Sequence, residues 1–276
     1  MIALNLHSAY KSRMRFCQVN VPETWNELSR EQLIAVAKVL LTEQNPYKRD
    51  VLLVKALVDV RRFWFQKMNP ETMLDELIPM VQFIKNETEL TEQLLPYIPF
   101  NRQKLYGPKS HLQNLRFGEF DAAERALYEF SKDQTSAVAL WRFVAILYRT
   151  PKLHYDRVKD AEGDCRSDYN ENLVEYYAQI LKEQQPMELA IAVMIWYKGC
   201  RNYILNRFDE VFSGENKSDE VESPAYFGLM RKIAERGIYG TMKEVEQLYI
   251  YNVMAELCET IKDNEAMKEQ MENNDE

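Results

Sequence analysis

Glycine is scarce in this chain. It accounts for only 8 of the 276 residues, against about 7% in an average protein. Dinucleotide-binding folds and phosphate-binding loops use glycine where the backbone must approach a ligand closely. The G-x-G-x-x-G, P-loop, G-x-S-x-G and H-E-x-x-H motifs are also missing. These absences count against the common nucleotide-dependent and hydrolytic enzymes. We expect a protein that is not an enzyme and needs no cofactor.

Closely spaced cysteines and metal-type histidine pairs are missing too. The four cysteines lie far apart in the sequence, at Cys17, Cys165, Cys200 and Cys258. None of them forms a C-x-x-C metal or redox pair. His154 lies among acids at positions 156–164, but these lack the regular spacing of a calcium loop. We predict reduced thiols, no metal site and a solvated polar loop around His154.

The sequence also lacks a long apolar run and a basic stripe. The run MELAIAVMIWY is about half as long as the ~20 residues that span a membrane. No signal peptide is recognisable at the N-terminus. The net charge is −8, of which residues 209–223 and 259–276 each carry −5, so the rest is close to neutral. Nucleic-acid binders show a basic surface instead. We expect a cytoplasmic protein whose partner is neither a membrane nor a nucleic acid.

What the first part of the sequence does have is helical periodicity with clear start signals. Ser29 and Gln32 fit a capping box at a helix start. Apolar spacing predicts the next helix over about 48–67. Asn69-Pro70 predicts the start of a third helix, which Pro79 should kink or divide. Residues 15–21 alternate and predict a short strand or an extended arm.

The second part is predicted to hold the central helices. Gly118 breaks the chain before a helix that places Asp121, Glu124 and Arg125 opposite its apolar face. The helix over 137–148 is apolar nearly all round, which is typical of a central helix in a bundle. Further helices are predicted at about 169–184, 187–212 and 225–236. Thr241 should cap a last helix that reaches about Ile261.

These patterns predict an all-α fold, an irregular multi-helix bundle, with a short β element near the N-terminus or near 100–118. We predict four regions: an N-terminal arm and helical subdomain at 1–95, a Pro/Gly-rich connection at 96–118, a main helical domain at 119–262, and a disordered acidic tail at 263–276. The tail has little to bury, so it should not order by itself.

The candidate partner-binding residues are aromatic and arginine side chains on the predicted central helices. They are Trp141, Arg142, Tyr148, Arg149, Trp196 and Tyr197. Each has a structural interpretation as well. The aromatic residues fit a core, Arg142 fits an ion pair or a side chain that reaches the surface along its stem, and Arg149 fits a cation at a helix C-terminus.

Three segments carry a resemblance to a known group of proteins. They are LYGPKSHLQNLRFGEFDAAERALYEF, LWRFVAILYRTPK and GIYGTMKEVEQLYIYNVMAEL. With PETWNELSREQL near the start, they resemble tail-assembly, tail-chaperone-like proteins of phages and prophages of Bacteroidota-type bacteria. The similarity covers about 22–258 in scattered motifs.

This resemblance implies a protein-binding assembly factor without a cofactor. Such a chaperone acts on a long helical tape-measure protein, or on tube subunits, in the cytoplasm of the bacterial host. The length of this chain exceeds that of many such chaperones. The first alternative is a structural tail or virion protein that remains in the particle. The second is a helical enzyme or regulator whose site is not recognisable from the sequence.

Overall fold

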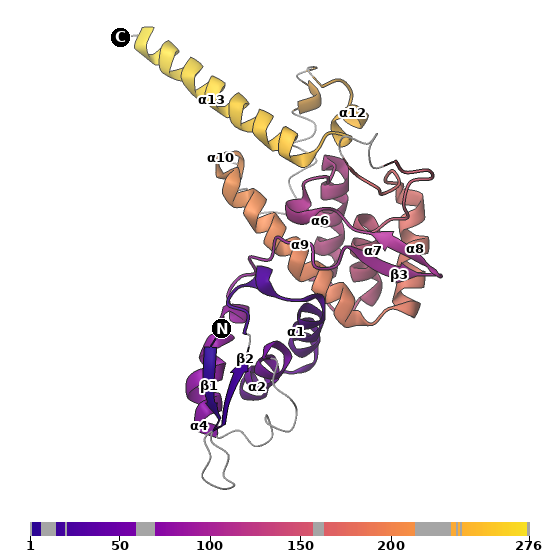
Figure 1. Ribbon diagram of the computed structural model, residues 1–276. Coiled ribbons are helices and arrows are strands. Elements are labelled where there is room, and N and C mark those ends of the chain that lie inside the picture. Colours follow the sequence, from indigo (N-terminus) through magenta and orange to yellow (C-terminus); the bar gives the residue numbers. More distant parts are fainter. Residues whose placement is uncertain are drawn as a thin grey trace. The chain divides into compact units, whose positions relative to one another are not determined.

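The chain is mostly helical, which confirms the all-α prediction. The computed structural model describes residues 2–6, 15–19, 21–58, 70–156, 163–212, 233–235, 237 and 239–274. The chain divides into two compact units. The first combines Met1–Leu94 with Pro186–Gly199, and the second combines Leu95–Gln185 with Cys200–Glu276. Figure 1 labels the elements.

The first unit opens with a β-hairpin. Strands β1 (Ile2–Leu6) and β2 (Arg15–Val19) pair antiparallel, with Leu4 opposite Cys17. The predicted strand at 15–21 is confirmed, while its partner β1 was not predicted. A short 3-10 turn, η1 (Trp25–Glu27), leads into the first helix.

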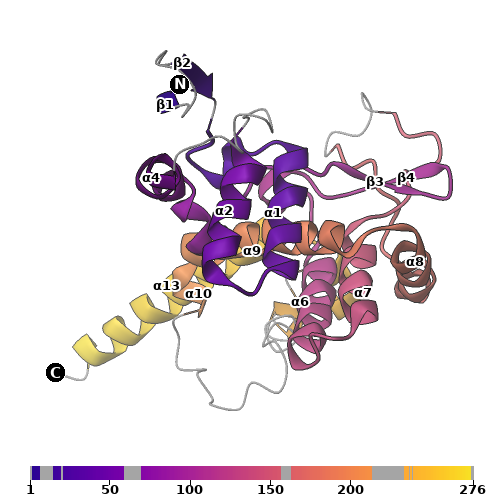
Figure 2. The same cartoon turned by 90° about the horizontal axis from the view of Figure 1, so that it is seen from below.

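Helices α1 (Arg30–Thr42) and α2 (Pro46–Leu57) pack side by side in this unit (Figure 2). The capping box is confirmed, because Ser29 Oγ accepts from the amide of Gln32 while Gln32 Oε1 accepts from the amide of Ser29. The helix predicted over about 48–67 begins close to the predicted start, but it ends at Leu57, so the predicted C-terminal end was wrong. Asn45 caps the helix before Pro46, and Val58 is extended. Val58 is β-branched and favours extended backbone, and residues 59–69 lie outside the described part.

The third predicted helix begins at Pro70, as expected, and is interrupted near Pro79. Helix α4 (Pro70–Thr72) continues as a π turn, η2 (Met73–Leu77), then as α5 (Ile78–Met80) and a 3-10 turn, η3 (Gln82–Lys85). Proline has no amide hydrogen to donate to the preceding turn, so regular α-helical bonding cannot pass through Pro79.

Helix α9 (Met187–Arg207) contributes its first thirteen residues to the first unit. Trp196 Nε1 donates to the carbonyl of Thr91 at 3.3 Å. Gly199 lies against the backbone of Leu90, and a Cβ at this position would clash with the Leu90 carbonyl oxygen. The close approach of the two backbones therefore requires glycine.

The second unit contains the predicted central helices. Strands β3 (Tyr97–Phe100) and β4 (Gln103–Tyr106) form a hairpin, which confirms a β element near 100–118. The 3-10 turn η4 (Ser110–Leu112) follows it. Helix α7 (Ala137–Leu147) packs against both α6 (Phe117–Lys132) and α8 (Glu171–Gln184). Eight residues of α7 are buried, which confirms its central place.

Gly118 does not precede α6 but lies in its first turn. A Cβ there would come within 3.0 Å of the Glu246 Cβ. The glycine thus serves close packing rather than a chain break. Helices α9 and α10 (Asp209–Phe212) divide the predicted helix at 187–212, because the regular helix ends at Arg207. The predicted helix at 225–236 falls almost wholly outside the described residues.

The last predicted helix is two helices in the structure. Gly237 and Gly240 have positive φ angles, as a turn requires, and Thr241 forms a capping box with Glu244. That box caps the short α12 (Met242–Glu246), and α13 (Ile250–Asn274) is a separate helix. Among the described helices, none is both long enough and apolar enough to cross a membrane.

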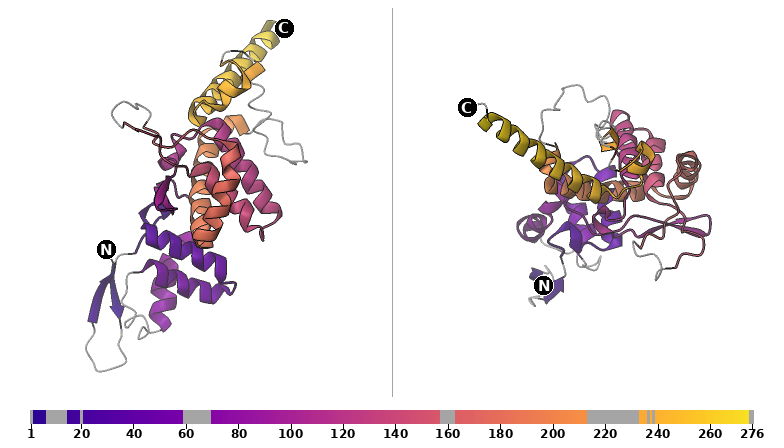
Figure 3. Two further views of the ribbon diagram at one scale, coloured as in Figure 1. Left: turned by 90° about the vertical axis from the view of Figure 1, so that its right-hand side faces the viewer. Right: turned by 90° about the horizontal axis from the view of Figure 1, so that it is seen from above.

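Helix α13 also contradicts the predicted disordered tail at 263–276, since it continues to Asn274 (Figure 3). The tail is rich in Glu, Lys, Gln, Met and Ala, which are strong helix formers, and it extends a helix already begun at Ile250. Extending an existing helix avoids the cost of nucleation. Lack of burial alone was therefore a poor guide to disorder.

Candidate functional site

Five of the six candidate partner-binding residues are buried in the structure. The buried residues are Trp141, Tyr148, Arg149, Trp196 and Tyr197. Tyr148 illustrates their role, because its hydroxyl donates to the carbonyl of Leu95 at 2.7 Å inside the second unit. A buried Tyr or Trp needs such a partner for its polar atom. These side chains pack within the chain and do not form an accessible aromatic surface.

Arg142 is the sixth candidate and the only one at the surface. Its side chain is 42% exposed, and its Nε donates to Glu175 Oε2 at 2.6 Å. A second acid, Glu129, has its Oε2 at 3.9 Å from Arg142 Nη1. Exposed ion pairs of this kind contribute little to stability. The predicted ion pair is confirmed, and contact with a partner stays a prediction.

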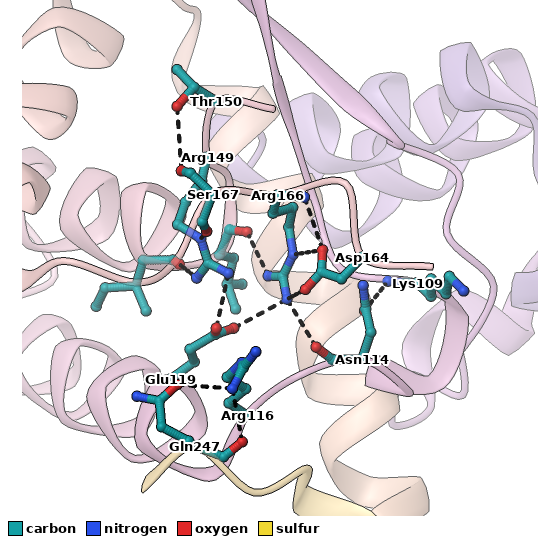
Figure 4. Close-up of polar contacts among 12 residues, drawn as sticks. Lys109, Asn114, Arg116, Glu119, Arg149, Thr150, Asp164, Arg166, Ser167 and Gln247 are labelled. Atoms are coloured by element: carbon teal, nitrogen blue, oxygen red, sulfur yellow. Dashed lines mark hydrogen bonds and ion pairs between the residues drawn. The ribbon is translucent and has the colours of Figure 1, made fainter. Parts of the chain in front are cut away.

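Arg149 belongs to a buried network of charged side chains (Figure 4). Its Nη1 donates to the carbonyl of Ile146 at 3.3 Å, which confirms the predicted interaction with the end of α7. Its Nε donates to the carbonyl of Ser167 at 2.7 Å. Its Nη2 donates to Glu119 Oε1 at 2.8 Å. The ion pair with Glu119 was not predicted.

Arg166 is the second cation of this network, and the sequence analysis did not identify it. It lies fully buried, with Asp164 Oδ2 at 2.9 Å and Glu119 Oε2 at 3.1 Å from its Nη2. It also donates to the backbone carbonyls of Leu147 and Asn114. Glu119 therefore lies between two arginines, and Asp164 supplies the second negative charge. We call Glu119, Arg149, Asp164 and Arg166 the ionic cluster.

Burial and charge act in opposite directions on the ionic cluster. Burial, and then repulsion from Arg166, lower the pKa of Arg149. Burial would also lower the pKa of Arg166, but Glu119 and Asp164 outweigh it and raise that pKa. Burial would raise the pKa of Asp164, but the bonds from Arg166 lower it overall. Asp164 and Arg166 thus stabilise each other's charged form against the cost of burial.

The ionic cluster joins three parts of the second unit. Glu119 lies in the first turn of α6, where the helix dipole favours an anion. Arg149 follows the end of α7, where the dipole favours a cation. Asp164 and Arg166 come from the loop after α7, which is tied back by backbone bonds from Lys152 to Cys165 and from Ser167 to Thr150. This arrangement holds the loop in place, which is a structural role.

The loop around His154, which was predicted to be solvated, is buried at its C-terminal end, where Asp164 and Arg166 lie. His154 itself is exposed, and residues 157–162 lie outside the described part. Within the described ranges, no group of three His, Cys, Asp or Glu side chains could hold a metal ion. Burial, together with Asp164, raises the pKa of the Cys165 thiol. Such a thiol is largely protonated at neutral pH and is a weak nucleophile.

Helix α6 also buries two of the acids that lie opposite its apolar face. Arg125 Nε lies 3.0 Å from Asp121 Oδ2 within α6, and Arg201 Nε of α9 donates to Glu124 Oε2 at 2.8 Å. Helical spacing shows which residues share a face, but not whether a charged face is buried.

Two neighbouring cavities lie where α13 meets α9 and α10 in the second unit. The tyrosine cavity has a volume of about 360 Å³. Its lining consists of His111, Gln113, Tyr203, Arg207, Tyr249, Tyr251 and Asn252. The acidic cavity, of about 510 Å³, has Asp209, Glu210, Glu256 and Glu259 among its lining residues. The two share Arg207 and Asn252.

The second half of α13 exposes apolar side chains. Met267 is 59% exposed and Met271 is 67% exposed. In the first half of the helix, Val253 and Leu257 are buried. One helix therefore packs on its own unit at its start and exposes methionines near its end.

Comparison with known proteins adds no relative: no protein family, curated protein or solved structure matches this chain.

Proposed function

We propose that the protein is a non-enzymatic, protein-binding assembly factor whose helix α13 contacts a helical partner. The observation that carries this proposal is the pair of exposed methionines on α13, Met267 and Met271. Met271 follows Val253 by five turns at 3.6 residues per turn, and Met267 lies about one turn before Met271. The two methionines therefore lie on the same face of α13 as the buried Val253 and Leu257, beyond the polar Thr260 and Asn264.

Methionine suits a surface that must fit the side chains of another helix. Its side chain is unbranched and polarisable, so it adapts to irregular partners. Anchors one turn apart match the way an amphipathic helix presents its apolar residues. Residues 259–276 carry a charge of −5. A second copy of α13 would bring like charges together, whereas a partner helix with basic flanks would be attracted.

The ionic cluster supports a structural rather than a chemical role for the most polar part of the interior. Glu119, Arg149, Asp164 and Arg166 bond to one another and to backbone carbonyls. Charges that are balanced in this way fix a loop, whereas the second half of α13 exposes apolar side chains that a partner could cover.

In finer terms, we propose a phage tail-assembly chaperone that acts on a tape-measure-type protein in the host cytoplasm. This step rests on the resemblance of the three sequence segments. It is supported by α13, whose exposed methionines could pack against a long helical partner. The main alternative is a structural tail protein, which would use the same surface but remain in the finished particle.

The test is co-expression of the tagged chain with the longest helix-rich protein encoded near it. We expect a stoichiometric complex that keeps the long protein soluble. The double variant Met267→Gln/Met271→Gln should lose the complex. The matched control is Leu153→Gln, because Leu153 is 88% exposed in a loop far along the chain from α13. Equal binding by both variants would contradict the assignment of α13.

Analysis of purified particles separates the chaperone from the structural alternative. A chaperone leaves before the tail is complete, so the chain should be absent from particles and present in assembly intermediates. A fixed number of copies per particle would replace the chaperone proposal with the structural one.

A further inference from the structure

The tyrosine cavity combines aromatic surfaces from separate parts of the second unit. His111 comes from η4, Tyr203 from α9 and Tyr251 from the start of α13, and Tyr249 directly precedes α13. The rings of His111 and Tyr203 meet edge to face, with centroids 5.0 Å apart. Tyr203 is 37% exposed, and Tyr249 and Tyr251 are half-buried. The cavity therefore brings four ring-bearing side chains together in one lining.

The backbone beneath these rings is held in an uncommon conformation. His111 and Leu112 both have left-handed backbone angles, with φ values of 59° and 58°. Such angles are unfavourable for residues other than glycine and persist only where surrounding contacts impose them. Here the Tyr251 hydroxyl donates to the carbonyl of His111 at 2.7 Å. Burial raises the pKa of Tyr251, which keeps that hydroxyl protonated.

Arg207 supplies a positive charge at this cavity. Its guanidinium carbon lies 5.9 Å from the centre of the Tyr251 ring, and its Nη1 donates to the Tyr203 hydroxyl at 3.2 Å. That contact uses one of the five N–H groups that a guanidinium carries. Because the side chain is exposed, Arg207 can present further donors to a ligand, in the planar arrangement that suits a carboxylate.

The charges around the cavity favour an anion with a single negative charge over an extended polyanion. Among the described residues that line it, none is acidic, although the chain as a whole carries −8. The neighbouring acidic cavity begins at the shared Arg207 and Asn252. An extended polyanion such as a nucleic acid would be repelled there by Asp209 and Glu210, whereas a ligand with a single negative charge would fit beside Arg207.

We propose that the tyrosine cavity binds a compact aromatic carboxylate. The ring would stack among Tyr203, Tyr249 and Tyr251, and the carboxylate would accept hydrogen bonds from Arg207. The amides of Gln113 and Asn252 lie in the same lining and can add donors. A volume of about 360 Å³ is at the lower end of the range for small-ligand sites. This proposal is independent of the function proposed for the exposed half of α13.

Two sources of this chemistry are compatible with the cavity. One is a free small acid, and the other is the C-terminal carboxylate of a peptide that ends in an aromatic residue. Either ligand would connect the first turn of α13 with η4 and α9. Binding should therefore raise the melting temperature of the chain as the ligand concentration rises above its dissociation constant.

The test is calorimetric titration of the full chain with three probes. They are 4-hydroxyphenylacetate, a five-residue peptide that ends in phenylalanine with a free carboxylate, and the same peptide with a C-terminal amide. We expect at least one of the two carboxylates to bind and the amide to bind more weakly. Binding of the small acid alone would identify a free metabolite-like ligand. Binding of the peptide acid would identify a chain terminus.

Arg207→Gln should weaken carboxylate binding by about tenfold or more, as expected when a charged hydrogen bond is lost. Lys262→Gln is the matched control, because Lys262 is a cation of the acidic cavity only. It should leave binding unchanged. Circular dichroism verifies that both variants fold. No binding of any probe at millimolar concentration, equal binding of acid and amide, or equal binding by wild type and Arg207→Gln would each overturn the proposal.

Discussion

The ionic cluster and the second half of α13 depart from the usual distribution of polar and apolar groups in opposite ways. The ionic cluster buries four charged side chains, whereas α13 exposes Met267 and Met271. The buried charges meet partners of opposite sign inside the same chain. The two methionines instead leave most of their apolar side chains exposed to solvent. Folding thus pairs the buried charges with one another, whereas the exposed methionines leave an apolar surface that another molecule could cover.

Removing the central acid should produce the largest effect on stability. Glu119→Gln leaves Arg149 and Arg166 close together in the interior without their shared anion. Breaking a buried ion pair on one side typically costs about 3–5 kcal/mol of unfolding free energy. Urea unfolding measures this loss as a shift in midpoint. A change below about 1 kcal/mol would mean that water reaches the ionic cluster and that it is not buried in solution.

Acid should weaken the ionic cluster through Asp164. Its pKa is lowered in the folded state, so its contribution is present above the unfolded pKa of about 3.9. That contribution is lost as the pH falls through the lower folded pKa. Asp164→Asn should cost about 1–3 kcal/mol at pH 7 and flatten the loss of stability below about pH 4. Urea midpoints measured from pH 7 to pH 3 give both quantities.

Asp121 provides a control of opposite sign for the acid experiment. Burial raises its pKa despite the nearby Arg125. A raised pKa disfavours the ionised form in the folded state, so protonation on acidification stabilises the fold. Asp121→Asn removes that gain and should steepen the acid loss. If Asp121→Asn and Asp164→Asn changed the profile in the same direction, the opposite assignment of these two carboxyls would be wrong.

The surface pair of Arg142 and Glu175 should matter far less than the ionic cluster. Glu175→Gln is chemically the same change as Glu119→Gln, but the pair it breaks is about half exposed. Exposed pairs contribute about 0–1 kcal/mol. Comparing the two variants in the same urea titration isolates the effect of burial. Equal losses from both would remove the distinction between surface and interior charges.

The double variant Met267→Gln/Met271→Gln should have the smallest effect on folding. Exposed substitutions usually change stability by less than about 0.5 kcal/mol, so the melting temperature should stay nearly constant. The same variant should abolish the complex with the partner. A marked drop in melting temperature without loss of the complex would show that these methionines pack within the chain.

The sequence predicted the elements whose signals are local. The capping box at Ser29, the helix start at Pro70 and the turn at Gly237 and Gly240 depend on neighbouring residues, and all were confirmed. The apolar circumference of α7 predicted its burial for a similar reason. The failures were helix ends, such as Val58, and the fate of the acidic tail, where local propensity and lack of burial pointed in different directions.

What the sequence determined by itself was a mostly helical chain, because capping and periodicity act over a few residues. Only the tertiary structure decided which charges are buried. Glu119 and Arg149 are separated by thirty residues, and no local rule pairs them. Only the tertiary structure decided which aromatic residues are accessible. It buried Trp141 and Trp196 and left Tyr203 partly open, because burial depends on which helices meet and not on the residues that each helix carries.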